Sequence, residues 1–132
     1  MAVYTKISTK NILSIEKKYN LGKIIYFKGI KKGIENTNYL LKTKNKKFIL
    51  TIFEKRVQKK DLPFFMNLME KLSRYKINCP KPQKNKNGSF LVKIKNKTGS
   101  IVSFVEGKDK LKLNPKNCYE IGKNIAKLHK AS

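Results

Sequence analysis

The run Phe48-Ile49-Leu50-Thr51-Ile52-Phe53 constrains the fold of this chain most strongly. Apolar residues occupy both of its alternating positions, so a strand formed here would be buried on both faces. A strand of this kind belongs in the middle of a sheet. Two further β-branched and aromatic runs precede it, at 23–27 and 38–43, and a Lys/Asn-rich turn at 44–47 separates the second run from the third. These segments predict a three-stranded antiparallel meander.

Helical spacing of apolar residues appears in three other segments. The first runs from about Thr9 to Tyr19, with Ser8 or Thr9 as its N-cap. For the second, Asp61 is the expected cap, Pro63 lies in the first turn, and the expected buried stripe consists of Phe65, Leu68, Met69 and Leu72. A third helix is predicted from about Asn114, with an apolar face made of Cys118, Ile121, Ile125 and Leu128.

The remaining strands are predicted at Ser89–Ile94 and Ser100–Val105, as a hairpin across the turn Lys95–Gly99. The expected order is therefore helix, three strands, helix, two strands, helix. A five-stranded antiparallel sheet crossed by a helix and followed by a connector and another helix is an α+β arrangement, typical of a nucleotide-binding small lobe.

Length and composition limit the possible classes of protein. A chain of 132 residues forms one domain at most, or a piece of a larger one, and 39% apolar residues suffice for a core. No apolar run approaches the roughly 20 residues that a membrane span requires, and residues 1–6 lack the pattern of a secretory signal. We therefore expect a cytoplasmic protein without a membrane partner. Cys79 and Cys118 are expected to be reduced thiols, and no metal-binding motif contains them.

The formal net charge of +24 raises the question of nucleic-acid binding, because counterion release drives basic proteins onto phosphate backbones. The basic residues are 30 Lys and only two Arg, Arg56 and Arg74, and they are spread through every segment. Arg is the residue that bidentate recognition of phosphate and guanine favours. A solvated Lys-rich surface is therefore the preferred interpretation, and no specific nucleic-acid partner is predicted.

Residues 27–39 are the most informative segment. Their glycine-containing turn, which ends in Glu35-Asn36-Thr37-Asn38-Tyr39, closely resembles that of the aminoglycoside-phosphotransferase and choline-kinase superfamily. Within this group, further segments resemble the bacterial homoserine kinases of the two-lobed type; these are residues 1–5, 48–57, 61–65, 101–107 and 121–129. The resemblance keeps its order from residue 1 to about residue 130.

This resemblance implies a protein-kinase-like small lobe. Residues 1–105 would form the ATP-binding N-terminal lobe, and residues 106–132 the connector and first helix of a truncated C-terminal lobe. The implied activity is the phosphorylation of L-homoserine to O-phospho-L-homoserine, a step toward threonine, with ATP and Mg²⁺. The family places its catalytic Asp, in a His-x-Asp-x-x-x-x-Asn loop, and its metal-binding Asp in the large lobe. Here Lys130 and Ala131 follow His129, so we expect an N-terminal portion that is inactive alone.

Four residues of the turn are candidate phosphate ligands: Gly29, Gly33, Asn36 and Asn38. Glycine permits backbone conformations and close approaches that a side chain would block, so that amide N–H groups can face an anion. The Asn side chains can bind phosphate or hold the turn. The alternative is an ordinary hairpin that needs glycine for its geometry.

In related kinases a cation on the third strand pairs with the phosphates, but this chain has Thr51 there. The homoserine kinases resemble it in this departure, so Lys55 or Arg56 just beyond is the candidate cation, with a solvated strand end as the alternative. Glu70 is a weak candidate for the carboxylate partner of that cation.

The resemblance places adenine against the segment that joins the lobes, where Phe104 and Val105 are the candidate residues for adenine binding. Ile34, Leu50 and Val102 are possible apolar walls, or plain sheet core. For His129 a cap or packing role is preferred over that of a general base.

Two alternatives to a homoserine kinase remain. The same fold can serve another small-molecule kinase, of the choline, methylthioribose or aminoglycoside type. The other alternative is a basic nucleic-acid-binding module, which would need exposed aromatic residues on a strand face. Four strand aromatics are expected to be core instead, namely Tyr26, Phe27, Phe48 and Phe53. The oligomeric state is not predicted.

Overall fold

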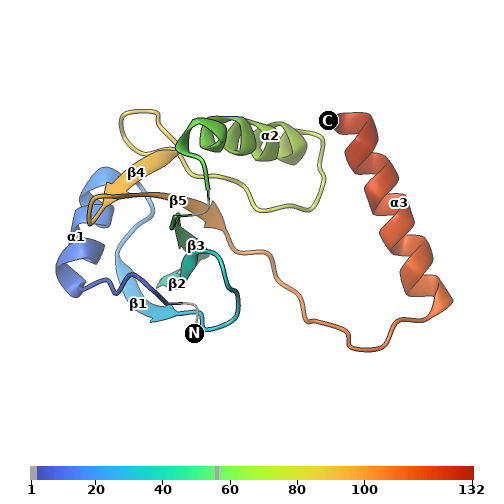
Figure 1. Ribbon diagram of the computed structural model, residues 1–132, viewed down its shortest axis with the longest axis horizontal. Helices are drawn as coiled ribbons and strands as arrows, with labels where there is room; N and C mark the ends of the chain where they lie inside the picture. The colour runs from blue at the N-terminus through green and yellow to red at the C-terminus, as the bar shows by residue number, and fades with distance from the viewer. Residues whose placement is uncertain (1–2, 56) are drawn as a thin grey trace.

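The computed structural model describes residues 3–55 and 57–132. Figure 1 shows the elements along the chain, and their order is the one that the sequence predicts. They are α1 (Thr9–Lys18), β1 (Ile24–Gly29), β2 (Thr37–Thr43), β3 (Lys47–Ile52), the 3₁₀ turn η1 (Lys59–Asp61), α2 (Leu62–Arg74), β4 (Leu91–Ile94), β5 (Lys97–Ser103) and α3 (Pro115–Ala131).

The five strands form one antiparallel sheet in the order β1-β2-β3-β5-β4. The prediction that β3 is central is confirmed, since β2 and β5 flank it. Leu50 lies opposite Tyr39 on one side and Ile101 on the other, and this row crosses the middle of the sheet.

The main core lies between this sheet and α1. Ile12, Ile15 and Tyr19 of α1 are buried at the helical spacing that the sequence predicts. They pack with one face of the sheet, whose buried apolar residues are Ile24, Tyr39, Leu41, Phe48, Leu50, Ile52, Val92, Ile94 and Ile101. Ser8 occupies the N-cap of α1, and its backbone N–H donates to Asn11 Oδ1 at 2.9 Å.

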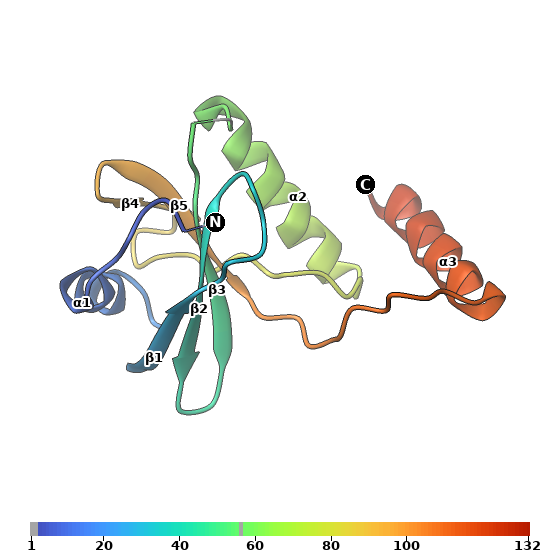
Figure 2. The same cartoon turned by 60° about the horizontal axis from the view of Figure 1, so that its bottom comes forward.

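Helix α2 lies on the opposite side of the sheet from α1, as Figure 2 shows. Asp61 occupies the predicted N-cap position of this helix. Its side chain makes no capping hydrogen bond, because its backbone is already helical at the end of η1. In the predicted stripe, Leu72 is buried and Leu68 and Met69 are half-buried, but Phe65 is 48% exposed, and Leu62 and Met66 are buried instead.

The β4–β5 hairpin is tighter than the sequence suggests. Its turn consists of Lys95 and Asn96, both with positive φ angles, 47° and 63°. Two such residues match the twist of the flanking strands, so the predicted five-residue turn at 95–99 is wrong. Strand β5 consequently begins at Lys97 and ends at Ser103, rather than running from Ser100 to Val105.

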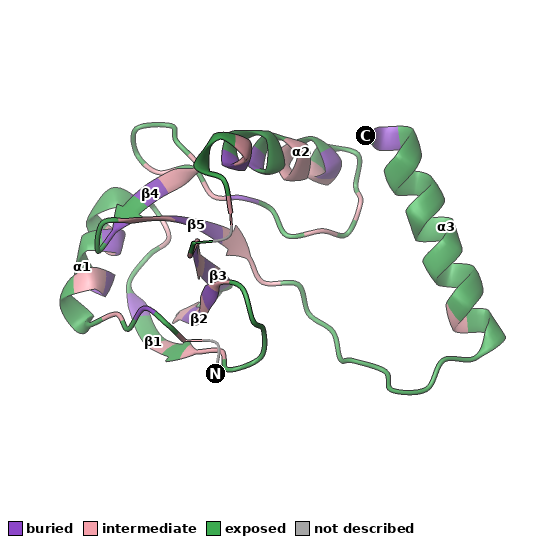
Figure 3. Cartoon of the chain, in the orientation of Figure 1, coloured by how far each residue is buried: buried purple, intermediate pink, exposed green. Residues whose placement is uncertain are grey.

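Helix α3 lies apart from the sheet at the end of an extended connection (Figure 1). Asn114 caps it by accepting a 2.9 Å hydrogen bond from the backbone N–H of Asn117. Most of α3 is exposed (Figure 3), including the apolar side chains of Ile121, Ile125 and Leu128. Among the described residues, no helix is long and apolar enough to cross a membrane.

Candidate functional site

The candidate site begins with the face of the sheet that points away from α1. Alternate residues of a strand point to opposite faces, so the register places two rows of side chains on this one. Leu40, Ile49 and Val102 form an apolar row, and Asn38, Thr51 and Ser100 form a polar row beside it. Apart from Ser100, which is buried, these side chains are only half-buried. These side chains therefore stay partly accessible to a ligand, although α2 lies on the same side of the sheet, and we call this face the open face.

Thr51 and Asn38 are joined directly across β2 and β3. The Thr51 hydroxyl donates to Asn38 Oδ1 at 2.8 Å. Position 51 therefore carries a neutral hydroxyl that is already partnered, close to where the turn between β1 and β2 meets the sheet. Asn38 therefore has a structural role as the acceptor of this bond, and a contact with a ligand would be a second role.

The turn of residues 30–36 joins β1 to β2 at this end of the sheet. Its base is closed by a 2.8 Å hydrogen bond from the backbone N–H of Ile30 to the carbonyl of Asn38. Gly33 has a φ of 112°, a conformation that suits glycine and few other residues. At Gly29 the requirement is for space. A Cβ there would lie 2.8 Å from Val3 Cγ2, so the Val3 side chain occupies the space that a larger residue would need.

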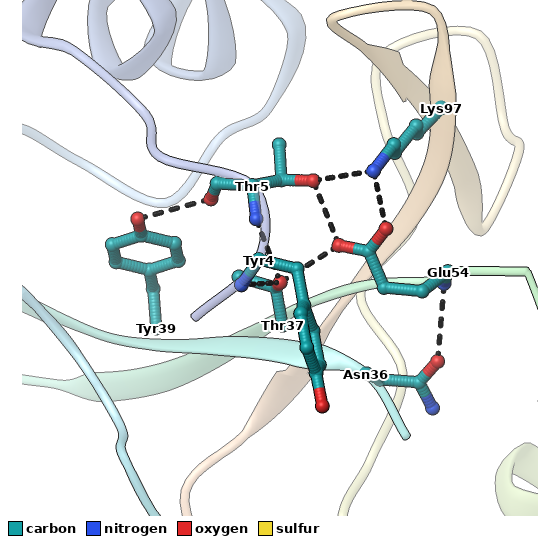
Figure 4. A network of polar contacts seen from close by, with 7 residues as sticks. All are labelled: Tyr4, Thr5, Asn36, Thr37, Tyr39, Glu54 and Lys97. Atoms are coloured by element: carbon teal, nitrogen blue, oxygen red, sulfur yellow. Dashed lines mark hydrogen bonds and ion pairs between the residues drawn. The ribbon is translucent and has the colours of Figure 1, made fainter. Parts of the chain in front are cut away.

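A polar cluster supports the stem of this turn from the side of α1 (Figure 4). The Glu54 carboxylate forms an ion pair with Lys97 and accepts hydrogen bonds from the Thr5 and Thr37 hydroxyls, each at 2.7 Å. Asn36 Oδ1 accepts a hydrogen bond of 3.2 Å from the backbone N–H of Glu54. Burial alone would raise the pKa of Glu54, but the bonds from Lys97, Thr5 and Thr37 outweigh it and lower that pKa.

Sequence reasoning missed this cluster. The five-residue turn predicted at 95–99 placed Lys97 outside any strand, and no local pattern joins Glu54 to a partner 43 residues later in the chain. The available signal was Glu54 itself, an acidic residue directly after an apolar strand in a chain that has 8 acidic and 32 basic residues.

The opposite end of the open face carries the segment that follows β5. The backbone N–H of Phe104 donates to the carbonyl of Lys47 at 3.1 Å, and the Lys47 ammonium lies 5.1 Å from the centre of the Phe104 ring. Lys47 also pairs with Glu106 at 2.6 Å. A shallow pocket is lined here by Lys42, Thr43, Lys44, Asn45, Lys46, Lys47, Phe104 and Glu106. Val105, which lies between Phe104 and Glu106 in the sequence, is 37% exposed.

Other candidate residues lie elsewhere. Leu50 is completely buried in the core on the side of α1, so the interpretation of Leu50 as a wall of the site is wrong. Ile34 is 76% exposed on the turn, and Lys55 is exposed just after β3. Arg56, the other candidate cation, lies outside the described residues.

Tyr26 is 43% exposed beneath the Lys42 ammonium, so its assignment to the core is also wrong.

Two titratable candidate residues, Glu70 and His129, lie on helices α2 and α3 and not on the strands of the open face. Glu70 pairs with Lys84 at 3.3 Å and with Arg74 at 3.4 Å. Burial alone would raise the pKa of Glu70, but these two cations together outweigh it and lower that pKa. Glu70 is therefore partnered by two cations other than Lys55. His129 is exposed near the end of α3. Within residues 3–55 and 57–132, no group of three or more His, Cys, Asp or Glu side chains can hold a metal ion.

The sequence matches the phosphotransferase enzyme family over residues 27–132. It is 43% identical to the homoserine kinase of Beijerinckia indica and 41% identical to that of Agrobacterium fabrum. The first match covers 99% and the second 100% of this chain, but each covers only 41% of the relative. The chain thus spans about two fifths of the length of these relatives.

Solved structures show the same fold at low sequence identity. A spectinomycin phosphotransferase in complex with ADP and spectinomycin superposes with a TM-score of 0.74 at 13% identity, over 97% of this chain and 39% of that one. An amicoumacin kinase in complex with AMP-PNP, Ca²⁺ and its ligand gives a TM-score of 0.61 at 16% identity, over 77% of this chain and 32% of that one. The expected α+β fold, a kinase-like small lobe with a five-stranded sheet, is confirmed.

Proposed function

The chain belongs to the phosphotransferase enzyme family, and on this premise we propose that it is the ATP-binding N-terminal part of a homoserine kinase. The observation that carries the proposal is the identity of about 40% with homoserine kinases along the whole chain. The reaction would be the transfer of the γ-phosphoryl group of ATP to the hydroxyl of L-homoserine. Residues 1–105 would form the nucleotide-binding lobe, and residues 106–132 the connector and first helix of the next lobe.

The open face of the sheet suits a nucleotide in length and chemistry. Phe104 continues β5 to about the level of Lys47, four residues before Thr51, which is roughly 13 Å along the strand. A nucleoside triphosphate that lies along β3 would cover this distance. The base would lie on the apolar row of Leu40, Ile49 and Val102, next to the backbone of residues 104–105. The phosphates would then reach the turn of residues 30–36, Asn38 and Thr51.

The phosphate end offers neutral hydrogen-bond donors more than fixed cations. Phosphoryl transfer depends on positioning and on charge neutralisation. The turn can provide backbone N–H groups around Gly33, and Lys55, exposed just after β3, is the candidate cation. The described residues contain no carboxylate cluster suited to Mg²⁺. The metal would be bound through the phosphates and through residues in the part of the relatives that this chain does not span.

Another small-molecule kinase remains the second candidate, supported by the fold likeness to the spectinomycin and amicoumacin kinases. The exposed Tyr26 beside Lys42 is the observation that supports the alternative of a nucleic-acid-binding module. Tight binding of single-stranded RNA at physiological salt would favour that module over both kinases.

Nucleotide binding is tested by NMR titration of the ¹⁵N-labelled chain with Mg²⁺ and AMP-PNP. We expect amide shifts confined to residues 30–38, 47–51 and 102–106. Ile49→Glu places a charge on the apolar row and should weaken binding at least tenfold. Ile25→Glu, at a residue 66% exposed on β1, is the matched control and should leave binding unchanged. Shifts centred elsewhere, or no saturable shifts at all, would contradict the proposed site.

A further inference from the structure

The N-terminal strap, residues 3–7, is bonded to the start of β2. The backbone N–H groups of Tyr4 and Thr5 both donate to the Thr37 hydroxyl, at 2.9 Å and 3.0 Å. The Tyr39 hydroxyl donates to the carbonyl of Thr5 at 3.1 Å and accepts from the backbone N–H of Ile7 at 3.2 Å. These bonds join segments more than 30 residues apart in the sequence.

The same strap reaches the turn itself. The Tyr4 hydroxyl donates to the carbonyl of Ile34 at 3.0 Å, and Val3 fills the space over Gly29 at the other end of the turn. The turn of residues 30–36 is therefore held at its start, in its middle and at its end. Residues 31–35 are exposed, so the turn is held by contacts with other segments, which also include the ion pair of Lys32 with Asp109 at 3.1 Å.

Glu54 connects the strap at Thr5, the start of β2 at Thr37 and the end of the turn at Asn36. Figure 4 shows its carboxylate between Thr5, Thr37 and Lys97, while its backbone N–H reaches the Asn36 side chain. The Glu54 side chain is only 10% exposed. Lys97 compensates its negative charge and also donates to the Thr5 hydroxyl at 2.7 Å, so the carboxylate does not leave a net negative charge beside an anion site.

We infer that Glu54 is a positioning residue, which sets the conformation of the turn of residues 30–36 through Thr37, Asn36 and the N-terminal strap. The inference rests on the proposed function in so far as this turn binds the phosphates. Glu54 itself makes no contact with the nucleotide. Its effect is to keep the amide N–H groups of the turn in one arrangement, so that binding does not have to order them.

The test compares Glu54→Gln with Glu70→Gln in the full 132-residue chain. Both substitutions remove one carboxylate charge from an ion-paired, mostly buried side chain, but Glu70 lies on α2, away from the turn. Amide hydrogen exchange is followed separately in residues 30–37 and in the core strands β3 and β5. AMP-PNP affinity is measured in the presence of Mg²⁺.

We expect E54Q to speed exchange in residues 30–37 at least tenfold, with the β3 and β5 amides close to wild type, and to weaken nucleotide binding about fivefold or more. E70Q should change neither. Thr37→Ser, which keeps the hydroxyl, should behave as wild type, whereas Thr37→Val should reproduce the effect of E54Q on the turn.

Unchanged exchange in the turn of E54Q, or an equal increase throughout the chain, would overturn the inference and leave Glu54 a general stabilising residue. Faster exchange with unaltered nucleotide affinity would also overturn it. If wild-type chain binds no nucleotide, the proposed function fails by itself, and the exchange pattern still decides whether Glu54 positions the turn.

Discussion

The Thr51 hydroxyl donates a 2.8 Å hydrogen bond to Asn38 Oδ1, across the two strands that lead away from the turn of residues 30–36. This bond occupies the third-strand position at which the family resemblance leads one to look for a cation. The phosphate end of the proposed site therefore begins with a rigid neutral pair. Positive charge at the phosphate end would then come from outside the strand, and Lys55 is the candidate for it.

Replacing Thr51 by Val should remove this bond while keeping the shape of the side chain. We expect a loss of about 1 kcal/mol in the free energy of unfolding. A double-mutant cycle with Asn38→Ala, measured by urea denaturation, isolates the bond from other effects of each substitution. Additive effects of the two substitutions would show that the pair contributes nothing to stability.

Leu50 and Ile49 are neighbours on β3 that should separate stability from binding. Leu50 is completely buried, so Leu50→Ala should cost about 2–5 kcal/mol by leaving a cavity. Ile49 is half-buried on the open face, and Ile49→Ala should cost clearly less while weakening nucleotide binding. Urea denaturation and AMP-PNP titration of the two variants test this, and similar losses of stability would argue against the assignment of faces.

Tyr19 is a buried residue whose hydroxyl has no hydrogen-bond partner among the described residues, and burial raises its pKa to about 12. Tyr19→Phe removes this unsatisfied group, so stability should stay level or rise by up to about 1 kcal/mol. Tyr39→Phe is the matched control, because the Tyr39 hydroxyl bonds to Thr5 and Ile7. Y39F should destabilise the chain, and a larger loss in Y19F would indicate a partner for the Tyr19 hydroxyl.

The lowered pKa of Glu54 predicts a dependence of stability on pH. A carboxyl whose pKa is lower in the folded chain stabilises it fully above the unfolded value of about 4.3 and loses this effect as the pH falls through the folded value. The stability difference between wild type and E54Q should therefore be largest at pH 6–7 and shrink below about pH 4. Urea unfolding at pH 7, 5, 4 and 3 measures it, and a difference independent of pH would mean that the charge of Glu54 is irrelevant.

The 132-residue chain alone should not phosphorylate homoserine with Mg²⁺ and ATP, because its sequence has no His-x-Asp loop and residues 3–55 and 57–132 contain no metal-binding cluster. Joining it to the remaining part of the Agrobacterium fabrum homoserine kinase, in place of the matching 41% of that protein, should give an active enzyme. An assay for O-phosphohomoserine compares the two proteins. Sustained turnover by the chain alone would refute the expectation that essential groups lie elsewhere.

Local patterns in the sequence were sufficient for the order of the elements. Periodicity acts over a few residues, so Ile12 and Ile15 marked α1 and the apolar run of 48–53 marked a central strand. The boundaries failed where short-range signals were ambiguous. A Lys/Asn-rich stretch looked like a long turn, yet two left-handed residues, Lys95 and Asn96, were enough to reverse the chain.

The sequence by itself determined the sheet, its central strand and the family resemblance, because these depend on contiguous residues. Only the tertiary structure decided which face of β3 meets α1, and hence that Ile49 rather than Leu50 faces the open side. It also decided that Glu54 pairs with Lys97 and supports the turn, since residues 43 positions apart become neighbours only when strand register and hairpin length are both settled.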